Sequence, residues 1–278
     1  MVKEEIDRII KQALAEDMPA GDLTTETIIP PNLKTRAIIV AKESGVLAGI
    51  DFAGRVFELI DPSIQFLKLK EDGQAFKSGD ILARIVGPAQ AILKGERTAL
   101  NFLQRLCGIA TMTARFVSAV AGTKTRILDT RKTTPTLRWF EKYAVRQGGG
   151  KNHRLNLSEA VLIKDNHLKI IGSIKEAMAR AKQALPPGTP IEVEVTSFKE
   201  AQEALEAGAS CLLLDNMSLK EMKRVVNLVK GRIPLEASGK INLRQVRQIA
   251  SLGIDYISVG RLTHSYQSID LSLEIEEE

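Results

Sequence analysis

Charged side chains follow several short apolar runs of this 278-residue sequence at the point where each run ends. The run Ile127-Leu128 leads into Asp129-Thr130-Arg131-Lys132, which holds two adjacent basic residues. Strand tips of this kind are where barrels and open α/β sheets keep their chemistry. We therefore expect one rim that binds anions and offers two carboxylates to a metal or to sugar hydroxyls. Later apolar runs end in the same way, at Lys164, Glu194, Asp215 and Gly260-Arg261.

Basic residues at this rim have the types and spacing that bind carboxylates. Arg131 and Lys132 are neighbours, so an extended turn directs them toward two different anionic groups. His153 and Arg154 follow shortly after a run of three glycines. Two guanidinium groups, each binding a carboxylate through parallel hydrogen bonds, suit a dicarboxylic acid. A single arginine is often only a surface ion pair, but its coincidence with His153 and Lys164 favours a binding site.

Two acidic residues, Glu194 and Asp215, are expected to end consecutive strands within reach of each other. Positive charge around them would keep both ionised, which suits a hard cation such as Mg²⁺ or sugar hydroxyls. The alternative is that they neutralise Lys132 and Lys164. His264 has no second ligand at a spacing typical of zinc, so we predict no zinc site there.

Glycine-containing loops follow the last two strand-like runs. Loops after the late strands of barrels commonly bind phosphate through backbone N–H groups, and we expect this of Ser238-Gly239-Lys240 and Val259-Gly260-Arg261. No serine, cysteine or aspartate stands beside an obvious base, so no covalent enzyme intermediate is expected. The residues instead suit a reaction in which the substrates supply both the nucleophile and the leaving group.

The spacing of the expected strand ends predicts the fold. Intervals of about 20 residues between strand ends fit a repeating strand–helix unit. The motif G-x-G-x-x-G is absent, which argues against a Rossmann fold. We predict an α/β protein with a small antiparallel module, flanked by helices, over residues 1–110 and an incomplete TIM-like (β/α) barrel over 111–278. The intervals run from Lys164 to Glu194, Asp215, Ser238 and Gly260, and are 30, 21, 23 and 22 residues long.

In the N-terminal domain, helical spacing of apolar residues predicts a helix over 3–16, and alternating patterns over 35–87 predict antiparallel strands. A further helix is expected over 94–106. Gly108 interrupts its pattern, so we predict a separate helical stretch over 110–120. Whether the C-terminal tail packs back on the N-terminal domain is left open.

Composition narrows the class of protein. With 44% hydrophobic and 26% charged residues, the sequence is typical of a globular enzyme. The net charge of +5 comes without a basic arm, and aromatic residues are only 4%, so we expect small polyanionic substrates and no nucleic acid. Cys107 and Cys211 lie in apolar surroundings, which predicts no disulfide. No apolar run is long enough for a membrane span, and we expect a cytoplasmic protein.

Together, the motifs of this sequence resemble the quinolinate phosphoribosyltransferase family, and the resemblance covers nearly the whole chain. It is carried by Glu16-Asp17, Gly21-Asp22-Leu23-Thr24-Thr25, Glu96-Arg97-Thr98-Ala99-Leu100-Asn101, Asp129-Thr130-Arg131-Lys132-Thr133, Gly148-Gly149-Gly150-Lys151-Asn152-His153-Arg154, Leu162-Ile163-Lys164-Asp165-Asn166-His167, Glu192-Val193-Glu194-Val195, Leu214-Asp215-Asn216-Met217, Glu236-Ala237-Ser238-Gly239 and Ser258-Val259-Gly260.

The resemblance implies an α/β sandwich followed by an open (β/α) barrel. It also implies a reaction that makes nicotinate mononucleotide, diphosphate and CO₂ from quinolinate and phosphoribosyl diphosphate, with Mg²⁺. Arg97 would reach the site of the neighbouring subunit of a homodimer, with further assembly into hexamers left open.

The resemblance also implies roles for the rim residues. The quinolinate carboxylates would be held by Arg131, His153, Arg154 and Lys164. The ribose, the diphosphate and its metal would face Lys132, Glu194 and Asp215, which are the catalytic candidates. The remaining substrate-binding candidates are Thr130, Ser238, Gly239, Lys240, Val259, Gly260, Arg261 and His264, of which Ser238, Gly239, Val259 and Gly260 would cradle the 5-phosphate.

Two positions depart from the family pattern, and rival functions stay open. Thr136 and Asn156 stand where the family usually has glycine, and asparagine tolerates a positive φ better than most residues.

One rival is a phosphoribosyltransferase of the same architecture, either nicotinate-specific or the molybdenum-transport-associated paralogue. The other is a non-catalytic sensor of phosphate ligands. Arg97 with Arg131 and Arg154 favours a dicarboxylate substrate.

Overall fold

The computed structural model describes residues 3–277. They form two compact units that are discontinuous along the chain. The first unit holds the residues up to Ala114, then Trp139–Gly149 and the residues from Tyr266 onward. The second unit holds Arg115–Arg138 and Gly150–Ser265.

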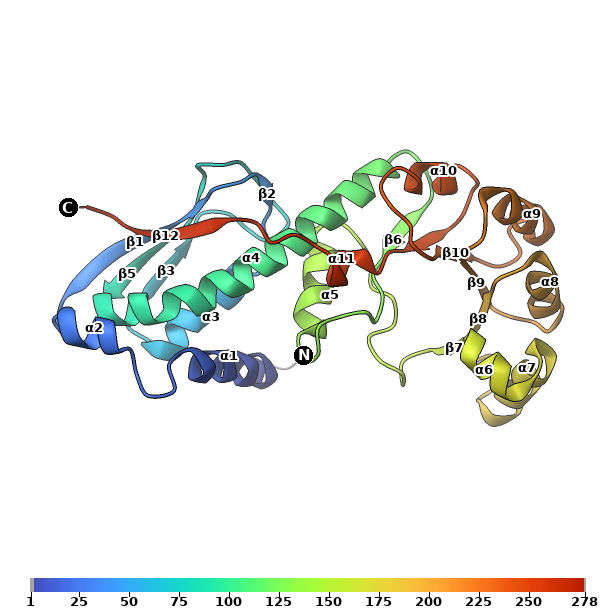
Figure 1. The fold of residues 1–278 in the computed structure, drawn as a ribbon, viewed down its shortest axis with the longest axis horizontal. Helices are drawn as coiled ribbons and strands as arrows, with labels where there is room; N and C mark the ends of the chain where they lie inside the picture. Colours follow the sequence, from blue (N-terminus) through green and yellow to red (C-terminus); the bar gives the residue numbers. More distant parts are fainter. Residues whose placement is uncertain (1–2, 278) are drawn as a thin grey trace. The chain divides into compact units, whose positions relative to one another are not determined.

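The first unit is built on an antiparallel sheet of four strands in the order β12-β1-β5-β3 (Figure 1). The C-terminal strand β12 pairs with β1, so Leu271 lies opposite Ala41. Helices bury their apolar faces in this unit, as helical spacing of Ile9, Ile10 and Leu14 predicts for α1. Its elements are α1 (Lys3–Asp17), α2 (Leu23–Ile28), β1 (Lys34–Ala41), β2 (Gly45–Val46), α3 (Ile50–Ile60), β3 (Gln65–Lys68), β4 (Ala75–Phe76), β5 (Ile81–Pro88), α5 (Arg138–Gln147), β12 (Leu271–Ile275) and most of α4 (Ala89–Ala119).

The second unit contains a parallel sheet of six strands in the order β6-β11-β10-β9-β8-β7. β6 and β7 stand at its two edges, so the strands of the described chain form an open barrel, which confirms the predicted fold class. Its elements are β6 (Arg126–Leu128), β7 (Val161–Ile163), α6 (Asp165–Ile171), α7 (Ile174–Ala184), β8 (Ile191–Val195), α8 (Phe198–Glu206), β9 (Cys211–Asp215), α9 (Leu219–Val229), β10 (Leu235–Ser238), α10 (Val246–Ala250), β11 (Tyr256–Ser258) and α11 (Arg261–His264).

The predicted break at Gly108 is wrong, because α4 runs through it as one helix of 31 residues. Glycine is required there for a different reason. A Cβ atom on Gly108 would lie 2.2 Å from the backbone oxygen of Gln267. The glycine therefore lets the returning chain pass close against the helix, within the first unit.

Both cysteines are free thiols, as predicted. Among residues 3–277, no helix combines the length and the apolar character that crossing a membrane requires.

Candidate active site

Alternation along the parallel strands sorts their side chains between two faces. In β8, Ile191, Val193 and Val195 are buried, while Glu192 and Glu194 point to the opposite face. Equivalent positions of the next strands continue that face, because the register pairs Glu194 with Leu213 and Leu213 with Glu236. One strand end after another therefore delivers polar groups to the same side of the sheet.

These polar groups line a cavity of about 890 Å³ within the second unit, a size typical of small-molecule sites. Its lining carries more basic than acidic side chains, which favours anionic ligands. With the exception of Arg97, every residue predicted for the site lines this cavity. The predicted residues in the lining are Thr130, Arg131, Lys132, His153, Arg154, Lys164, Glu194, Asp215, Ser238, Gly239, Lys240, Val259, Gly260, Arg261 and His264.

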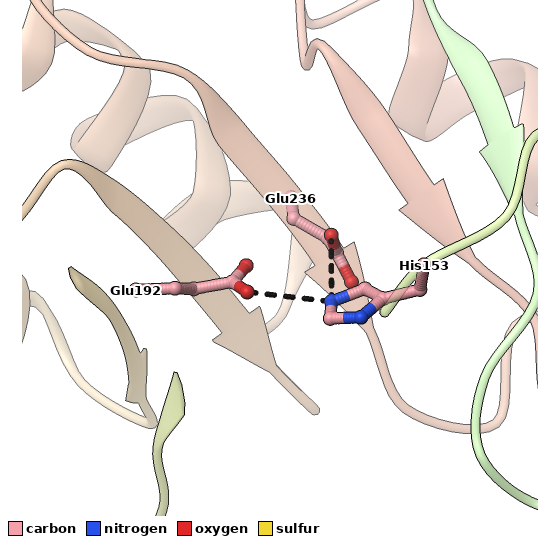
Figure 2. A group of neighbouring side chains, drawn as sticks. All are labelled: His153, Glu192 and Glu236. Carbon is pink, nitrogen blue, oxygen red and sulfur yellow. Dashed lines mark ion pairs between the residues drawn. The ribbon is translucent and has the colours of Figure 1, made fainter. Parts of the chain in front are cut away.

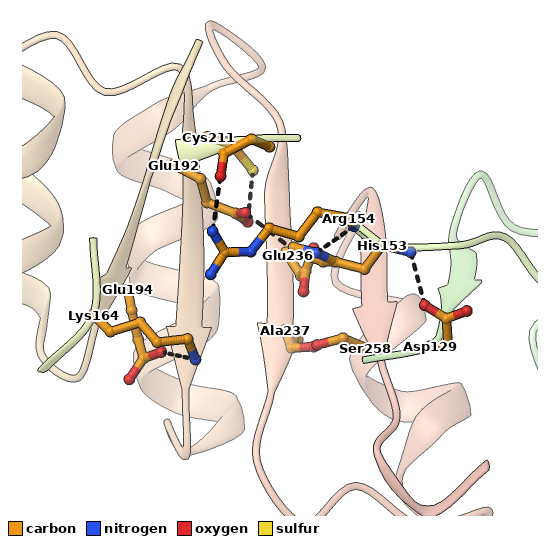
Figure 3. A network of polar contacts seen from close by, with 11 residues as sticks. Asp129, His153, Arg154, Lys164, Glu192, Glu194, Cys211, Glu236, Ala237 and Ser258 are labelled. Carbon is orange, nitrogen blue, oxygen red and sulfur yellow. Dashed lines mark hydrogen bonds and ion pairs between the residues drawn. The ribbon is translucent and has the colours of Figure 1, made fainter. Parts of the chain in front are cut away.

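A buried carboxylate fixes the segment that carries His153 and Arg154. Asp129 directly follows β6 and is fully buried. Its side chain accepts a hydrogen bond from the backbone N–H of His153 at 2.9 Å (Figure 3) and another from Asn152 Nδ2. Lys151 also donates its backbone N–H to Ile127. The segment is thereby tied to the end of β6.

Two guanidinium groups in the cavity repel each other, and the charge of Glu192 offsets this repulsion only in part at Arg154. Arg154 has a pKa lowered first by burial and then by the charge of Arg131. Its Nη1 donates to the carbonyl of Ala160 at 2.7 Å, a partner without net charge. Arg131 Nε is buried and has no hydrogen-bond partner among the described residues. An anion placed against both arginines would relieve their repulsion and fill this open donor position.

The two predicted carboxylates have different partners. Glu194 is largely buried and accepts a hydrogen bond from Lys164 Nζ at 2.9 Å (Figure 3). Asp215 accepts from Asn216 Nδ2 at 2.6 Å. The alternative that they neutralise lysines therefore holds in part, for Glu194 and Lys164. Both carboxylates still line the cavity and present oxygen donors, the ligand type that Mg²⁺ takes, so the donor set fits that ion.

Two glutamates that the sequence prediction did not assign to the site lie beside His153. Its Nε2 is 3.3 Å from Glu192 Oε2 and 3.6 Å from Glu236 Oε2 (Figure 2). Burial, followed by the charge of Glu192, raises the pKa of Glu236 to about 7. Period-two alternation from Glu194 and from Ser238 is the signal that places both glutamates on the cavity face.

Backbone turns shape the loops around the cavity. Gly239 has φ +101, and a Cβ atom there would lie 2.3 Å from Asn216 Oδ1, so this turn requires glycine. Thr263 Oγ1 donates to the carbonyl of Lys132 at 2.7 Å and ties that lysine's segment to α11. Of the two departures from the family pattern, Thr136 has φ 68, in the left-handed region.

Asn156 does not have a positive φ. It forms a local turn instead, in which its Oδ1 accepts from the backbone N–H of Ser158 at 2.9 Å. The glycine run is structural as well, since a Cβ atom on Gly148 would lie 2.3 Å from the carbonyl oxygen of Ala110. Arg97 lies on α4 with its side chain more than half exposed, and its ion-pair partner is the adjacent Glu96 at 3.8 Å.

Comparison with known proteins shows the family. The sequence model for the N-terminal domain of quinolinate phosphoribosyl transferase matches residues 22–107, and the model for its C-terminal domain matches residues 109–274. This chain belongs to the quinolinate phosphoribosyltransferase family. It is therefore a pentosyltransferase enzyme, which excludes a non-catalytic sensor.

Close relatives of this transferase cover it almost completely. It is 44% identical to the probable nicotinate-nucleotide pyrophosphorylase [carboxylating] of Synechocystis sp., over 97% of this chain and 92% of the relative. It is 41% identical to the protein of the same name from Bacillus subtilis, over 98% and 93%. The crystal structure of NadC from Streptococcus pyogenes superposes with a TM-score of 0.94 at 43% identity, over 100% and 99% of the two chains.

Proposed function

We propose that this transferase joins quinolinate to phosphoribosyl diphosphate and releases nicotinate mononucleotide, diphosphate and CO₂, a step of de novo NAD biosynthesis. The observation that carries the substrate assignment is the pair of mutually repelling guanidinium groups of Arg131 and Arg154, with an open donor position at Arg131 Nε. A pyridine dicarboxylate such as quinolinate carries two negative charges, one for each of these arginines, whereas nicotinate has only one carboxylate. Similarity to relatives named carboxylating pyrophosphorylases supports the same choice over the nicotinate-specific and molybdenum-associated alternatives.

In this proposal, the cavity binds the two substrates side by side. Arg131, His153, Arg154 and Lys164 hold the quinolinate carboxylates. Lys132, Glu194 and Asp215 face the ribose and diphosphate, while the turns that contain Gly239 and Gly260 bind the 5-phosphate through backbone N–H groups. The protein contributes position and charge, and its side chains form no covalent bond with either substrate.

The chemistry follows from that placement. The ring nitrogen attacks the anomeric carbon while diphosphate leaves, and the ribose passes through a state with oxocarbenium character. The buried carboxylate of Glu194 and the side chain of Asp215 stabilise that positive charge. The ring nitrogen is then cationic, so the adjacent carbon can lose its carboxyl group because the positive nitrogen stabilises the electron pair left on that carbon.

We also propose that Mg²⁺ accompanies phosphoribosyl diphosphate and that Glu194 and Asp215 hold it, directly or through water and the diphosphate. When bound, Mg²⁺ would neutralise charge on the leaving diphosphate. We further propose that the enzyme is a homodimer in which Arg97 completes the site of the neighbouring subunit. We also propose that it is cytoplasmic.

The test is to incubate the purified enzyme with phosphoribosyl diphosphate, Mg²⁺ and either quinolinate or nicotinate, and to follow nicotinate mononucleotide by chromatography. We expect product from quinolinate and none from nicotinate. Product from nicotinate alone would make this the monocarboxylate enzyme, and product from neither would favour the paralogue with another acceptor.

Calorimetric titration of the Arg131→Ala variant tests the carboxylate site separately. Removing a charged partner of a buried ligand group costs about 2–5 kcal/mol, so quinolinate affinity should fall by a factor of at least about 30. Affinity for phosphoribosyl diphosphate should change much less. Equal losses for both ligands would contradict the assignment of Arg131 to quinolinate.

A further inference from the structure

Glu192 and Glu236, the two glutamates beside His153, have no part in the mechanism described so far, although they lie in the cavity region. Only Glu236 of the two glutamates lines the cavity. Glu236 is only 2% exposed, and its Oε1 has no hydrogen-bond partner among the described residues. A buried, unpaired carboxyl oxygen at the wall of a cavity is costly unless a ligand or a proton occupies it.

His153 cannot supply that proton as a freely turning imidazole, because its tautomer is fixed. Its Nδ1 accepts a hydrogen bond from the backbone N–H of Arg154 at 2.8 Å. The ring proton therefore lies on Nε2, which faces both Glu192 and Glu236. A single N–H of His153 therefore faces the carboxyl groups of both Glu192 and Glu236. Two negative carboxylates so close together repel each other, which favours binding of one additional proton by the cluster.

That proton is held best on Glu236. Its side chain is 3% exposed, against 15% for Glu192, and burial disfavours its charged form. The other groups that act on it leave this conclusion unchanged. They are Glu192 of β8, which raises the pKa of Glu236, and His153, Ser258 and Lys164, which lower it. The thiol of Cys211 beside Glu192 has its own pKa raised by burial and by both glutamates, so it stays uncharged.

The reaction proposed above consumes one proton at a defined atom. When the C2–carboxyl bond of the pyridinium ring breaks, CO₂ leaves and the electron pair stays on C2. A proton must then form the C2–H bond of nicotinate mononucleotide. In the placement proposed above, the carboxyl group that leaves lies beside His153, whose Nε2 is 3.6 Å from Glu236 Oε2.

We propose that Glu236 is the general acid that transfers its carboxyl proton to C2 as the carboxyl group leaves, and that His153 is a positioning residue for this acid. The electron pair left on C2 forms the new C2–H bond, and the Glu236 carboxylate regains a proton from solvent after product release. Lys164 is the competing donor, since only one of the three N–H groups of its ammonium donates to Glu194, at 2.9 Å, and the Glu236→Gln variant below distinguishes the two acids. This inference rests on the proposed placement of quinolinate.

The test is single-turnover analysis of the full-length Glu236→Gln variant with quinolinate, phosphoribosyl diphosphate and Mg²⁺. Diphosphate, CO₂ and nicotinate mononucleotide are measured separately. We expect diphosphate release to change by less than about tenfold, whereas nicotinate mononucleotide formation falls by about 10²–10⁴-fold, the usual contribution of a general acid. The undecarboxylated pyridinium nucleotide should accumulate.

The pH profile provides a readout that loss of packing would not produce. The acid form of Glu236 is present below its pKa of about 7 and is lost as the pH rises. The product-forming rate of the parent enzyme should therefore fall on the alkaline side, and this limb should be absent in Glu236→Gln. Glu236→Asp, which keeps an acid, should retain the limb at a lower rate and serves if the glutamine variant does not fold.

Glu192→Gln is the matched control, with the same change in the same cluster but away from the cavity wall. Removing the Glu192 charge makes Glu236 easier to ionise, so the alkaline limb should move to lower pH. Product formation should stay coupled to diphosphate release.

The assignment of the acid would be overturned if Glu236→Gln formed nicotinate mononucleotide in step with diphosphate release and kept the alkaline limb of its pH profile unchanged. Loss of diphosphate release in a folded Glu236→Gln would also overturn it. Failure of the parent enzyme to use quinolinate would instead defeat the proposed substrate, and the acid with it.

Discussion

Thr136 holds a left-handed backbone conformation, with φ 68, that a β-branched residue rarely adopts. A non-glycine residue in that region costs about 1–3 kcal/mol. Glycine removes the strain but loses about 0.5–1 kcal/mol through its greater freedom in the unfolded chain. We therefore expect Thr136→Gly to raise the free energy of unfolding by about 1 kcal/mol, as measured by urea denaturation.

Thr136→Ala is the control for this prediction. Alanine keeps the Cβ atom that causes the strain, so its gain should be clearly smaller than that of glycine. If glycine destabilised the protein instead, the threonine would have a stabilising contact that outweighs its backbone strain.

At the residue scale, most residues predicted for the site line the cavity, because the sequence makes the strand ends that carry them recognisable. It did not assign Glu192 and Glu236, since they lie inside their strands rather than after them. The sequence also gave no sign of the raised pKa of Glu236. Its causes, burial and the closeness of Glu192, arise only when the strands assemble into the sheet. The departure at Thr136 marked a real positive φ, whereas the one at Asn156 did not.

Elements were predictable where local patterns decide them. The parallel strands of the barrel were found from short apolar runs and regular spacing, and each strand end lies within two residues of its predicted position. The single helix α4 was divided wrongly, since glycine interrupts helical propensity whether it breaks a helix or accommodates a neighbouring chain. The neighbour at Gly108 is Gln267, 159 positions later, and no local pattern reports such a contact.

Gly108→Ala separates these two roles of glycine. Helix propensity alone would make alanine stabilising by about 1 kcal/mol. A Cβ atom 2.2 Å from a backbone oxygen forces the chain apart, and overpacking of this kind costs about 1–3 kcal/mol. We expect the collision to prevail, with a lower free energy of unfolding in urea.

The matched change elsewhere on α4 is Asn101→Ala, at an exposed position of the same helix. It should stabilise the protein by a few tenths of a kcal/mol through propensity alone. A Gly108→Ala variant that was also stabilised would show that the returning chain moves aside without cost.

At the scale of the whole molecule, the surplus of basic residues is concentrated where the anionic substrates are proposed to bind. The cavity is lined by six lysine or arginine side chains and three carboxylates, whereas the chain as a whole has a net charge of +5. Such a cavity attracts polyanions from solution, and salt should weaken that attraction. Arg97 is the one predicted site residue outside this lining, and the proposed homodimer gives it a role.

Complementation between two inactive variants tests that role. In a dimer with shared sites, Arg97→Ala and Lys132→Ala each inactivate both sites. A mixed dimer restores one of its two sites, because one cavity is intact and receives Arg97 from the other subunit. Random pairing makes half of the dimers mixed, so co-expression should recover about a quarter of the parent activity. The control mixture, Lys132→Ala with Asp215→Ala, places both changes in the cavity and should recover none. Equal, negligible activity in both mixtures would show that Arg97 does not act across subunits.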